Sequence, residues 1–341
     1  MAGDSIFIRM PLYDTELIGV IGADGKNMTG HWINHNRGAD YKVPFSAEMI
    51  EPNGITYSSG DANLVDGRWA VRFDPDHADS SSAIGLFTAH ENGTVTGSFA
   101  TETGDHRFLD GEVRNDSMRL SSFDGSHVYL FVARIAGDSM FGRFNSGIHW
   151  EEPWIAVKDA DFDLRDPASL TNSTTELVEF SFPDLNGEEV SSQDPRFRGK
   201  ALILQVMGSW CSNCADEAAE LNDLYRKYRS EGLEVVGVAF EKQEDPTRAK
   251  SVLRRFSDGL HLEYPILFGG HAKTASEKLP FIDKLRSYPT SIFIDQNGKV
   301  RSILTGNYGP GTGELHHNYR KKINDLVEQM IRERSFAQPS N

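Results

Sequence analysis

The only two cysteines of this 341-residue chain, Cys211 and Cys214, are separated by two residues. They follow an apolar run, residues 201–207, that is typical of a buried strand, and they precede apolar residues at helical spacing such as Ala218 and Leu221. We therefore expect Cys211 at a strand-to-helix turn and Cys214 in the first helical turn, where free N–H groups and the helix dipole favour a thiolate. A thiolate is the reactive form of cysteine, and a neighbour three positions away can close a disulfide with it. The pair is predicted to be a dithiol redox centre.

Composition restricts the kind of protein that carries this pair. The length favours two domains, each large enough for its own core. No apolar run approaches the roughly 18 residues of a membrane span, and residues 1–10 show no signal-peptide pattern. We therefore expect any export signal or membrane tether to be absent from this chain. Two cysteines at redox spacing also differ from the many structural disulfides of a small secreted scaffold.

The negative charge is concentrated in the front half of the chain. Residues 1–165 carry a net charge of −12, whereas residues 166–341 carry −3 of the total of −15. Such an acidic surface argues against binding to nucleic acid and to anionic membranes.

Residues 1–165 are predicted to form an all-β antiparallel barrel or sandwich. Short alternating runs recur every 8–12 residues, and no helical period of useful length appears before residue 210. The strongest hairpin signal is Asn92-Gly93, between predicted strands 83–89 and 94–101. The other predicted strands are residues 5–10, 30–34, 41–49, 69–73, 107–113, 118–123, 127–135, 139–145 and 154–157.

Aromatic residues and histidines of this β-rich half allow two interpretations. Four tryptophans are expected to fill the barrel, although a small barrel can also hold a ligand in its mouth. The seven histidines lack the spacing of a metal site, so no metal is predicted. The tryptophans are Trp32, Trp69, Trp150 and Trp154.

The pattern changes after a polar linker at residues 166–175. From residue 176 to 341, apolar β-branched runs alternate with amphipathic helical stretches, which predicts an α/β domain. Its expected strands are residues 180–182, 201–207, 234–240, 265–268, 291–295 and 300–305, the last two joined by a hairpin turn. Its expected helices follow Cys214 and cover residues 246–256 and 314–334, with partly helical structure at 271–286.

Several motifs of this second half resemble the TlpA/ResA-like thiol–disulfide oxidoreductases of the thioredoxin superfamily. The resemblance covers about residues 176–335 and rests on Arg198-Gly199-Lys200 before the central strand, on residues 210–214 (WCSNC), and on Tyr288-Pro289-Thr290. It implies a thioredoxin-like fold with an extra helix and strand between Cys214 and Pro289. The front half looks like the β-rich N-terminal extension of some bacterial TlpA-like proteins.

Site residues follow from the same resemblance. Cys211 is the expected exposed attacking thiolate and Cys214 the buried resolving thiol. Pro289 matches the family's cis-proline, which faces the dithiol and leaves the backbone of Tyr288 free to pair with a bound peptide. Trp210 is expected to pack against the sulfurs and shield them.

Glu217 has two interpretations. It matches a carboxylate that assists proton transfer at the buried thiol in ResA-like members, and one helical turn places it within reach of Cys214. Equally, it could be a surface charge favoured near a helix N-terminus. Two departures from the family pattern are Gln205-Val206-Met207 at the strand end, which changes the packing around the site, and Ser212-Asn213, which lacks the histidine of strongly oxidising members.

The predicted function is therefore a thiol–disulfide oxidoreductase that reduces disulfides of extracytoplasmic proteins and is recharged by an upstream thiol–disulfide electron donor. No cofactor is predicted, and the resemblance implies a bacterial protein that is periplasmic or membrane-tethered. Three alternatives remain. A peroxidase is disfavoured by Gly208 where a Thr-x-x-Cys motif needs threonine. A copper-handling protein would use the thiolates with a distant histidine: His261, His271, His316 or His317. The third is a ligand-binding protein whose barrel does the main work on a thioredoxin scaffold.

Overall fold

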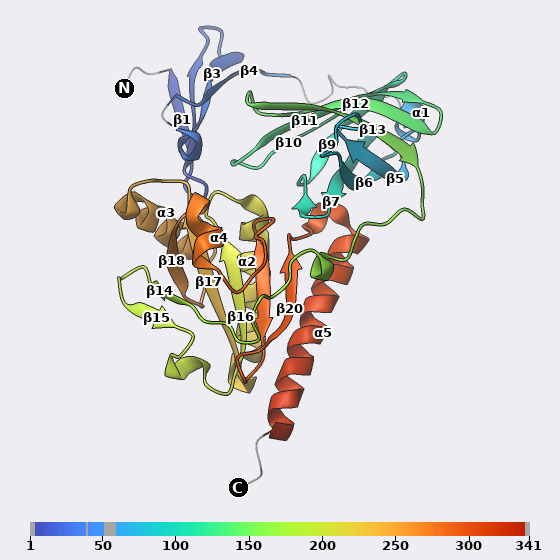
Figure 1. Cartoon of the computed structure of the whole chain (residues 1–341). Coiled ribbons are helices and arrows are strands. Elements are labelled where there is room, and N and C mark those ends of the chain that lie inside the picture. The colour runs from blue at the N-terminus through green and yellow to red at the C-terminus, as the bar shows by residue number, and fades with distance from the viewer. Residues whose placement is uncertain (1–3, 39, 51–58, 338–341) are drawn as a thin grey trace. The chain divides into compact units, whose positions relative to one another are not determined.

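The computed structural model describes residues 4–38, 40–50 and 59–337 (Figure 1). The chain divides into two compact units, the first with residues 1–101 and 106–164 and the second with residues 102–105 and 165–341. The first unit is built from antiparallel strands and the second is α/β. The predicted pair of folds is confirmed.

Eight strands of the first unit close into an antiparallel barrel. The sheet order is β6-β5-β13-β12-β11-β10-β9-β7, and pairing of β7 with β6 closes it. These strands are β5 (Gly67–Phe73), β6 (Ser81–Ala89), β7 (Thr94–Thr101), β9 (Leu109–Arg114), β10 (Ser117–Phe123), β11 (Val128–Ala136), β12 (Ser139–Ser146) and β13 (Trp150–Lys158). The Asn92-Gly93 turn joins β6 and β7 as expected, with Gly93 at φ +83°.

Aromatic side chains pack the inside of this barrel. Phe131 stacks between Phe99 and Phe144, with ring centroids 4.2 Å and 4.4 Å away. Trp69 and Trp154 are also buried in this core. The expectation that all four tryptophans fill the barrel is wrong, because Trp32 is buried outside it on β3 and Trp150 is 55 % exposed at the end of β13.

A separate four-stranded antiparallel sheet precedes the barrel in the chain. Its strands are β1 (Ser5–Met10), β2 (Thr15–Ile21), β3 (Asn27–Asn34) and β4 (Lys42–Glu48), paired in that order. The sequence pattern missed β2, because Leu17 and Ile18 are adjacent and break the alternation that identifies a half-buried strand. It also missed α1 (Ser59–Ala62), which is too short to show a helical period.

The second unit is a five-stranded sheet with helices. The order β18-β17-β16-β19-β20 places β16 (Ala201–Met207) at the centre, parallel to β17 (Leu233–Glu241) and antiparallel to β19 (Thr290–Ile294). The outer strands are β18 (Ile266–His271) and β20 (Val300–Thr305), and β14 (Ser181–Pro183) with β15 (Glu189–Ser191) forms a small hairpin. The helices are α2 (Ser212–Tyr228), α3 (Pro246–Gly259), α4 (Ala275–Lys278) and α5 (Glu314–Ala337), and β8 (Gly104–Asp105) also falls in this unit.

Burial explains why β16 reads as one apolar run. Every residue of β16 and of β17 is buried, as expected for central strands covered on both faces. Short 3₁₀ turns connect the longer elements of both units: η1 (His35–Arg37), η2 (Pro167–Ser169), η3 (Pro195–Phe197), η4 (Arg229–Glu231), η5 (Ala272–Thr274) and η6 (Pro310–Thr312).

Residues 166–175, which the sequence pattern suggests as a linker, are hydrogen-bonded within the second unit. The Thr171 and Thr305 hydroxyls are 2.8 Å apart, and the backbone N–H of Asn172 donates to Asp283 at 3.0 Å. The amino group of Lys322 donates to Asp166 at 2.6 Å. Within the described ranges, no helix is both long and apolar enough to cross a membrane.

Candidate active site

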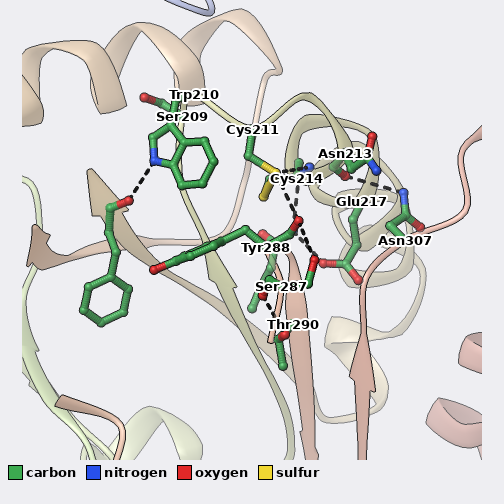
Figure 2. Close-up of a disulfide and its surroundings, with 12 residues drawn as sticks. Ser209, Trp210, Cys211, Asn213, Cys214, Glu217, Ser287, Tyr288, Thr290 and Asn307 are labelled. Atoms are coloured by element: carbon green, nitrogen blue, oxygen red, sulfur yellow. Dashed lines mark hydrogen bonds between the residues drawn. A yellow bond between two sulfur atoms is a disulfide. The ribbon is translucent and has the colours of Figure 1, made fainter. Parts of the chain in front are cut away.

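Cys211 and Cys214 form a disulfide at the start of α2 (Figure 2). Cys211 is the N-cap residue in an extended conformation, and its sulfur accepts a hydrogen bond from the backbone N–H of Cys214 at 3.1 Å. Their Cα atoms are 5.2 Å apart, a normal disulfide separation. The strand β16 ends four residues before Cys211, so the pair lies at the predicted strand-to-helix turn.

The two sulfur-bearing residues differ little in exposure in this oxidised state. Cys211 is 6 % exposed and Cys214 is 0 % exposed. Cys211 is the more exposed of the two, as predicted, but it is largely buried, whereas the sequence predicts an exposed thiolate. One reason is that the loop before β19 packs against it, with the Tyr288 carbonyl oxygen 3.4 Å from Cys211 Sγ.

The peptide bond between Tyr288 and Pro289 is cis. Pro289 is held by its own carbonyl oxygen, which accepts from the N–H of Gly306 at 2.8 Å. The Thr290 hydroxyl donates to the carbonyl of Ser287 at 2.9 Å, which fixes the other side of the loop. The Tyr288 carbonyl, which belongs to the cis peptide, therefore lies beside Cys211, as Figure 2 shows.

Trp210 forms a wall next to the disulfide. Its indole N–H donates to the carbonyl of Phe240 at 3.0 Å, and its ring meets the Tyr288 ring edge to face at 5.1 Å. The Lys242 ammonium lies 3.7 Å from the indole centroid, within the range of a cation–π contact. Trp210 is therefore fixed in place beside the sulfurs, as the sequence suggested.

Glu241 is a site residue that the sequence pattern did not reveal. It ends β17 and is fully buried, and its carboxylate accepts from the backbone N–H of Ser209 at 2.8 Å and from the Ser209 hydroxyl at 2.7 Å. These charge-assisted bonds hold the turn that carries Trp210 and Cys211. The only available signal was a charged residue at the end of an otherwise apolar run.

Glu217 is fully buried one helical turn after Cys214, so its interpretation as a surface charge is wrong. Its carboxylate accepts from Gln205 Nε2 at 2.9 Å and from the Tyr319 hydroxyl at 3.1 Å. Burial raises the pKa of Glu217 to about 7, against these hydrogen bonds, which favour the charged form. A carboxyl that titrates near neutral pH beside a thiol can accept or return a proton.

Gln205 explains one departure from the family pattern. It is the polar residue within β16, it is fully buried, and its Oε1 accepts from the Tyr264 hydroxyl at 3.3 Å. Its Nε2 lies 3.4 Å from the Cys214 carbonyl oxygen. Gln205 therefore joins the carboxyl of Glu217 to the turn that holds the resolving cysteine. Tyr264 and Tyr319 could not be linked to the site from the sequence, because both are distant in the chain.

The segment 102–105 contacts the same region within the second unit. The Asn213 side chain, between the two cysteines, donates to the Asp105 carbonyl at 3.3 Å, and the N–H of Gly309 donates to the Asp105 carboxylate. The Ser287 hydroxyl donates to the carbonyl of Thr103 at 2.8 Å. These contacts join residues about 100 to 200 positions apart, which no local pattern indicates.

Two of the four histidines considered as copper ligands, His271 and His316, have other partners. His271 Nδ1 accepts from the N–H of Lys273 at 3.1 Å, and His316 Nδ1 lies 2.7 Å from the carbonyl oxygen of Tyr308. Among the residues that the structure describes, no three His, Cys, Asp or Glu side chains group as metal ligands. The geometry gives the copper alternative no support.

A disulfide at a helix N-terminus, a facing cis-proline and a buried carboxyl on a five-stranded α/β sheet define a thiol–disulfide oxidoreductase of thioredoxin-like fold. Residues 174–303 match the model of the AhpC/TSA family. The thiol–disulfide oxidoreductase ResA of Bacillus thuringiensis subsp. konkukian is 30 % identical over 150 residues, which cover 43 % of this chain and 76 % of that protein. ResA of Geobacillus thermodenitrificans is 29 % identical over 147 residues, with the same coverage.

Solved structures also match part of the chain. A thiol:disulfide interchange protein of the thioredoxin family from Chlorobium tepidum is 20 % identical, with a TM-score of 0.37, and covers 50 % of this chain and 99 % of its own. The ResA matches and the geometry of the site show that the chain belongs to the ResA-like thiol–disulfide oxidoreductases.

Proposed function

We propose that this protein reduces disulfides of extracytoplasmic proteins with the Cys211–Cys214 dithiol. An upstream thiol–disulfide electron donor then reduces the Cys211–Cys214 disulfide again. One observation carries the proposal: the disulfide lies between a cis-proline loop and a fully buried carboxyl, Glu217. The location outside the cytoplasm rests on the resemblance to TlpA/ResA-like proteins. The reducing direction rests on Ser212-Asn213, which lacks a histidine between the cysteines.

The reaction begins with both cysteines reduced. The Cys211 thiolate, favoured at the N-terminus of α2, attacks one sulfur of the substrate disulfide and forms a mixed disulfide. The other substrate sulfur leaves as a thiolate and takes a proton from solvent. The Tyr288 backbone and the Trp210 wall are proposed to hold the substrate chain beside Cys211 during this step.

Cys214 then resolves the mixed disulfide. Its thiol gives its proton to the Glu217 carboxylate and the resulting thiolate attacks Cys211 Sγ, which releases the second substrate thiolate. That thiolate also takes a proton. Two electrons have passed to the substrate, which becomes a dithiol, and the protein ends in the disulfide state seen here.

The test is reduction of a protein disulfide by the reduced full chain. We expect stoichiometric loss of the substrate disulfide with formation of the Cys211–Cys214 disulfide, and multiple turnovers when a dithiol donor is supplied. The Cys214→Ser variant should accumulate a mixed disulfide at Cys211, visible as a mass increase equal to the substrate. Cys211→Ser should form none. A reduced parent that leaves protein disulfides intact would contradict the proposal.

A control with hydrogen peroxide distinguishes the proposed disulfide reductase from a peroxidase, the alternative suggested by the AhpC/TSA family match. We expect slow consumption of hydrogen peroxide, because Gly208 stands at the position that a Thr-x-x-Cys nucleophile motif assigns to threonine. Peroxide consumption faster than protein disulfide reduction would favour the peroxidase instead.

A further inference from the structure

A groove between α2 and α5 reaches the buried side of the active site. The Tyr228 hydroxyl of α2 lies 2.6 Å from Glu328 Oε1 and 3.0 Å from Asn324 Oδ1 of α5, so the two helices lie side by side. The groove between them has a volume of about 290 Å³. Its lining residues from α2 are Glu217, Glu220, Leu221 and Leu224. Its lining residues from α5 are His317, Arg320, Lys321, Ile323 and Asn324.

Glu220 is the second carboxyl in this groove. It lies one helical turn after Glu217, on the same face of α2, and its side chain is 14 % exposed. Its Oε1 is 3.6 Å from His316 Nδ1 and its Oε2 is 3.9 Å from Arg320 Nε, both beyond hydrogen-bond distance. Oε2 is buried and has no hydrogen-bond partner among the described residues.

The proton that leaves Cys214 needs a path from Glu217 to solvent. When Cys214 attacks Cys211, its proton passes to Glu217, and on the return half-reaction a proton must come back. Glu217 has no exposed surface, and the side chains that act on its carboxyl, Gln205, Ser291 and Tyr319, are themselves buried. An amide cannot relay a proton at neutral pH. The groove side, where Glu220 lies, is therefore the open side of Glu217.

We propose that Glu220 carries protons between Glu217 and the water of the α2/α5 groove during disulfide closure and opening. Glu220 acts on Cys214 only through Glu217. This inference rests on the proposed function only through the role of Glu217 at Cys214. In closure, the Glu217 carboxyl passes its proton to the Glu220 carboxylate, which releases it to solvent. In opening, the same two groups return it. No electrons move in either transfer.

The titration of both groups suits such a relay. Burial raises the pKa of Glu217 to about 7, and burial together with the nearby Glu217, Asp216 and Asp223 carboxylates raises the pKa of Glu220 to about 8, while Arg320 opposes the shift. Both carboxyls therefore change protonation near neutral pH, and transfer between them is nearly balanced. The titratable or charged groups that face Glu220 are Glu217, Asp216 and Asp223 of α2 and His316, His317, Tyr319, Arg320 and Lys321 of α5.

The test follows closure of the dithiol with a small disulfide, so that no protein substrate is needed. The reduced full chain is mixed with oxidised glutathione, and the rate of closure is followed by tryptophan fluorescence, which includes that of Trp210 beside the disulfide. The comparison is between parent and Glu220→Gln, with imidazole at low and at high concentration and constant ionic strength. Glu314→Gln is the matched control, because it makes the same substitution at an exposed carboxylate of α5 that does not line the groove.

At low imidazole we expect Glu220→Gln to close at least about tenfold more slowly than the parent, a smaller loss than the roughly 10²–10⁴ of full general acid–base catalysis because water still enters the groove. High imidazole, a diffusible proton carrier, should restore most of the rate. Glu314→Gln should close at the parental rate at both concentrations. A Glu220→Gln rate equal to that of the parent, or a slow rate that imidazole leaves unchanged, would overturn the proposal.

A second variant and a second measurement cover the cases in which the first variant does not fold or the proposed function fails. If Glu220→Gln does not fold, Glu220→Ala is compared in the same way, since loss of the side chain only enlarges a groove open to water. If the parent closes with oxidised glutathione but leaves protein disulfides intact, the proposed function fails while the comparison of closure rates still decides the role of Glu220.

Discussion

Gln205 Nε2 donates a 2.9 Å hydrogen bond to Glu217 Oε2 inside the core of the α/β unit. The pair joins the central strand β16 to the active-site helix α2, and the Tyr319 hydroxyl of α5 donates to the other carboxylate oxygen at 3.1 Å. A buried carboxyl with two neutral donors keeps a pKa near neutrality, whereas a salt bridge would hold it low. The protonation of Glu217 is therefore set by strands and helices distant in sequence.

Tyr319→Phe should raise the pKa of Glu217. The Tyr319 hydroxyl favours the charged carboxylate, so its loss favours the protonated form and moves the pH dependence of disulfide closure to higher pH. The cost in stability should be about 1 kcal/mol, because the single hydroxyl proton of Tyr319 is shared between Glu217 and the Gly306 carbonyl oxygen.

The matched control for that change is Tyr264→Phe. Its hydroxyl donates to Gln205 Oε1 and does not touch Glu217, so stability should fall by a similar amount without a shift of the pH profile. Equal profile shifts in the two variants would show that the direct bond to Glu217 is not responsible.

Glu217→Gln should alter how stability depends on pH. The pKa of Glu217 is raised by burial from 4.5 to about 7 in the folded state, so the unfolded chain loses this proton first as pH rises. The parent therefore loses stability between about pH 4.5 and 7, on the order of 2–3 kcal/mol for this group. The variant lacks this loss.

Chemical denaturation at several pH values measures this difference. The stability of Glu217→Gln minus that of the parent should rise from pH 4.5 to 7 and then level off. A difference that is constant with pH would mean that the carboxyl of Glu217 titrates at its ordinary value. The difference reports Glu217 together with its effect on Glu220, because the Glu217 carboxylate contributes to the raised pKa of Glu220.

Cys211 should react with an alkylating reagent before Cys214 in the reduced protein. Cys211 keeps 6 % of its surface exposed and caps the helix, whereas Cys214 has no exposed surface. Mass mapping after a sub-stoichiometric label should find the label on Cys211. Preferential labelling of Cys214 would reverse the roles assigned to the two thiols.

Residues 165–175 should stabilise the α/β unit. A fragment of residues 165–341 keeps the bonds of Asp166, Thr171 and Asn172 to the rest of the unit, and a fragment of residues 176–341 loses them. The longer fragment should therefore unfold at a higher temperature, by about 2–4 °C for each kcal/mol at this size range. Identical midpoints would mean that these residues act only as a tether.

The sequence predicted the second unit in detail because its signals are local. The apolar run 201–207 became β16, and the turn after it placed Cys211 at the N-cap of α2. The first unit was predicted as a barrel or sandwich because alternation identifies strands but does not say how they close. Closure depends on the pairing of β6 with β7, which is a property of the whole sheet.

The surroundings of the disulfide could be predicted only in part. Pro289 was found from its resemblance to a family motif, and the structure shows its cis peptide beside Cys211. Glu217 left two interpretations, since helical spacing gives the neighbour of Cys214 but not which face α5 will cover. The contributions of Tyr319 and Glu241 depend on tertiary packing that brings distant segments together.

The reduction potential of the Cys211–Cys214 pair tests the account most directly. The full chain is equilibrated with defined ratios of reduced and oxidised dithiothreitol or glutathione, and the fraction of disulfide is read by mass after alkylation. A reductant of protein disulfides should have a potential near that of thioredoxin, about −270 mV. A value near the −120 mV of a strong oxidant such as DsbA, at roughly the same pH, would contradict the proposed direction of electron flow.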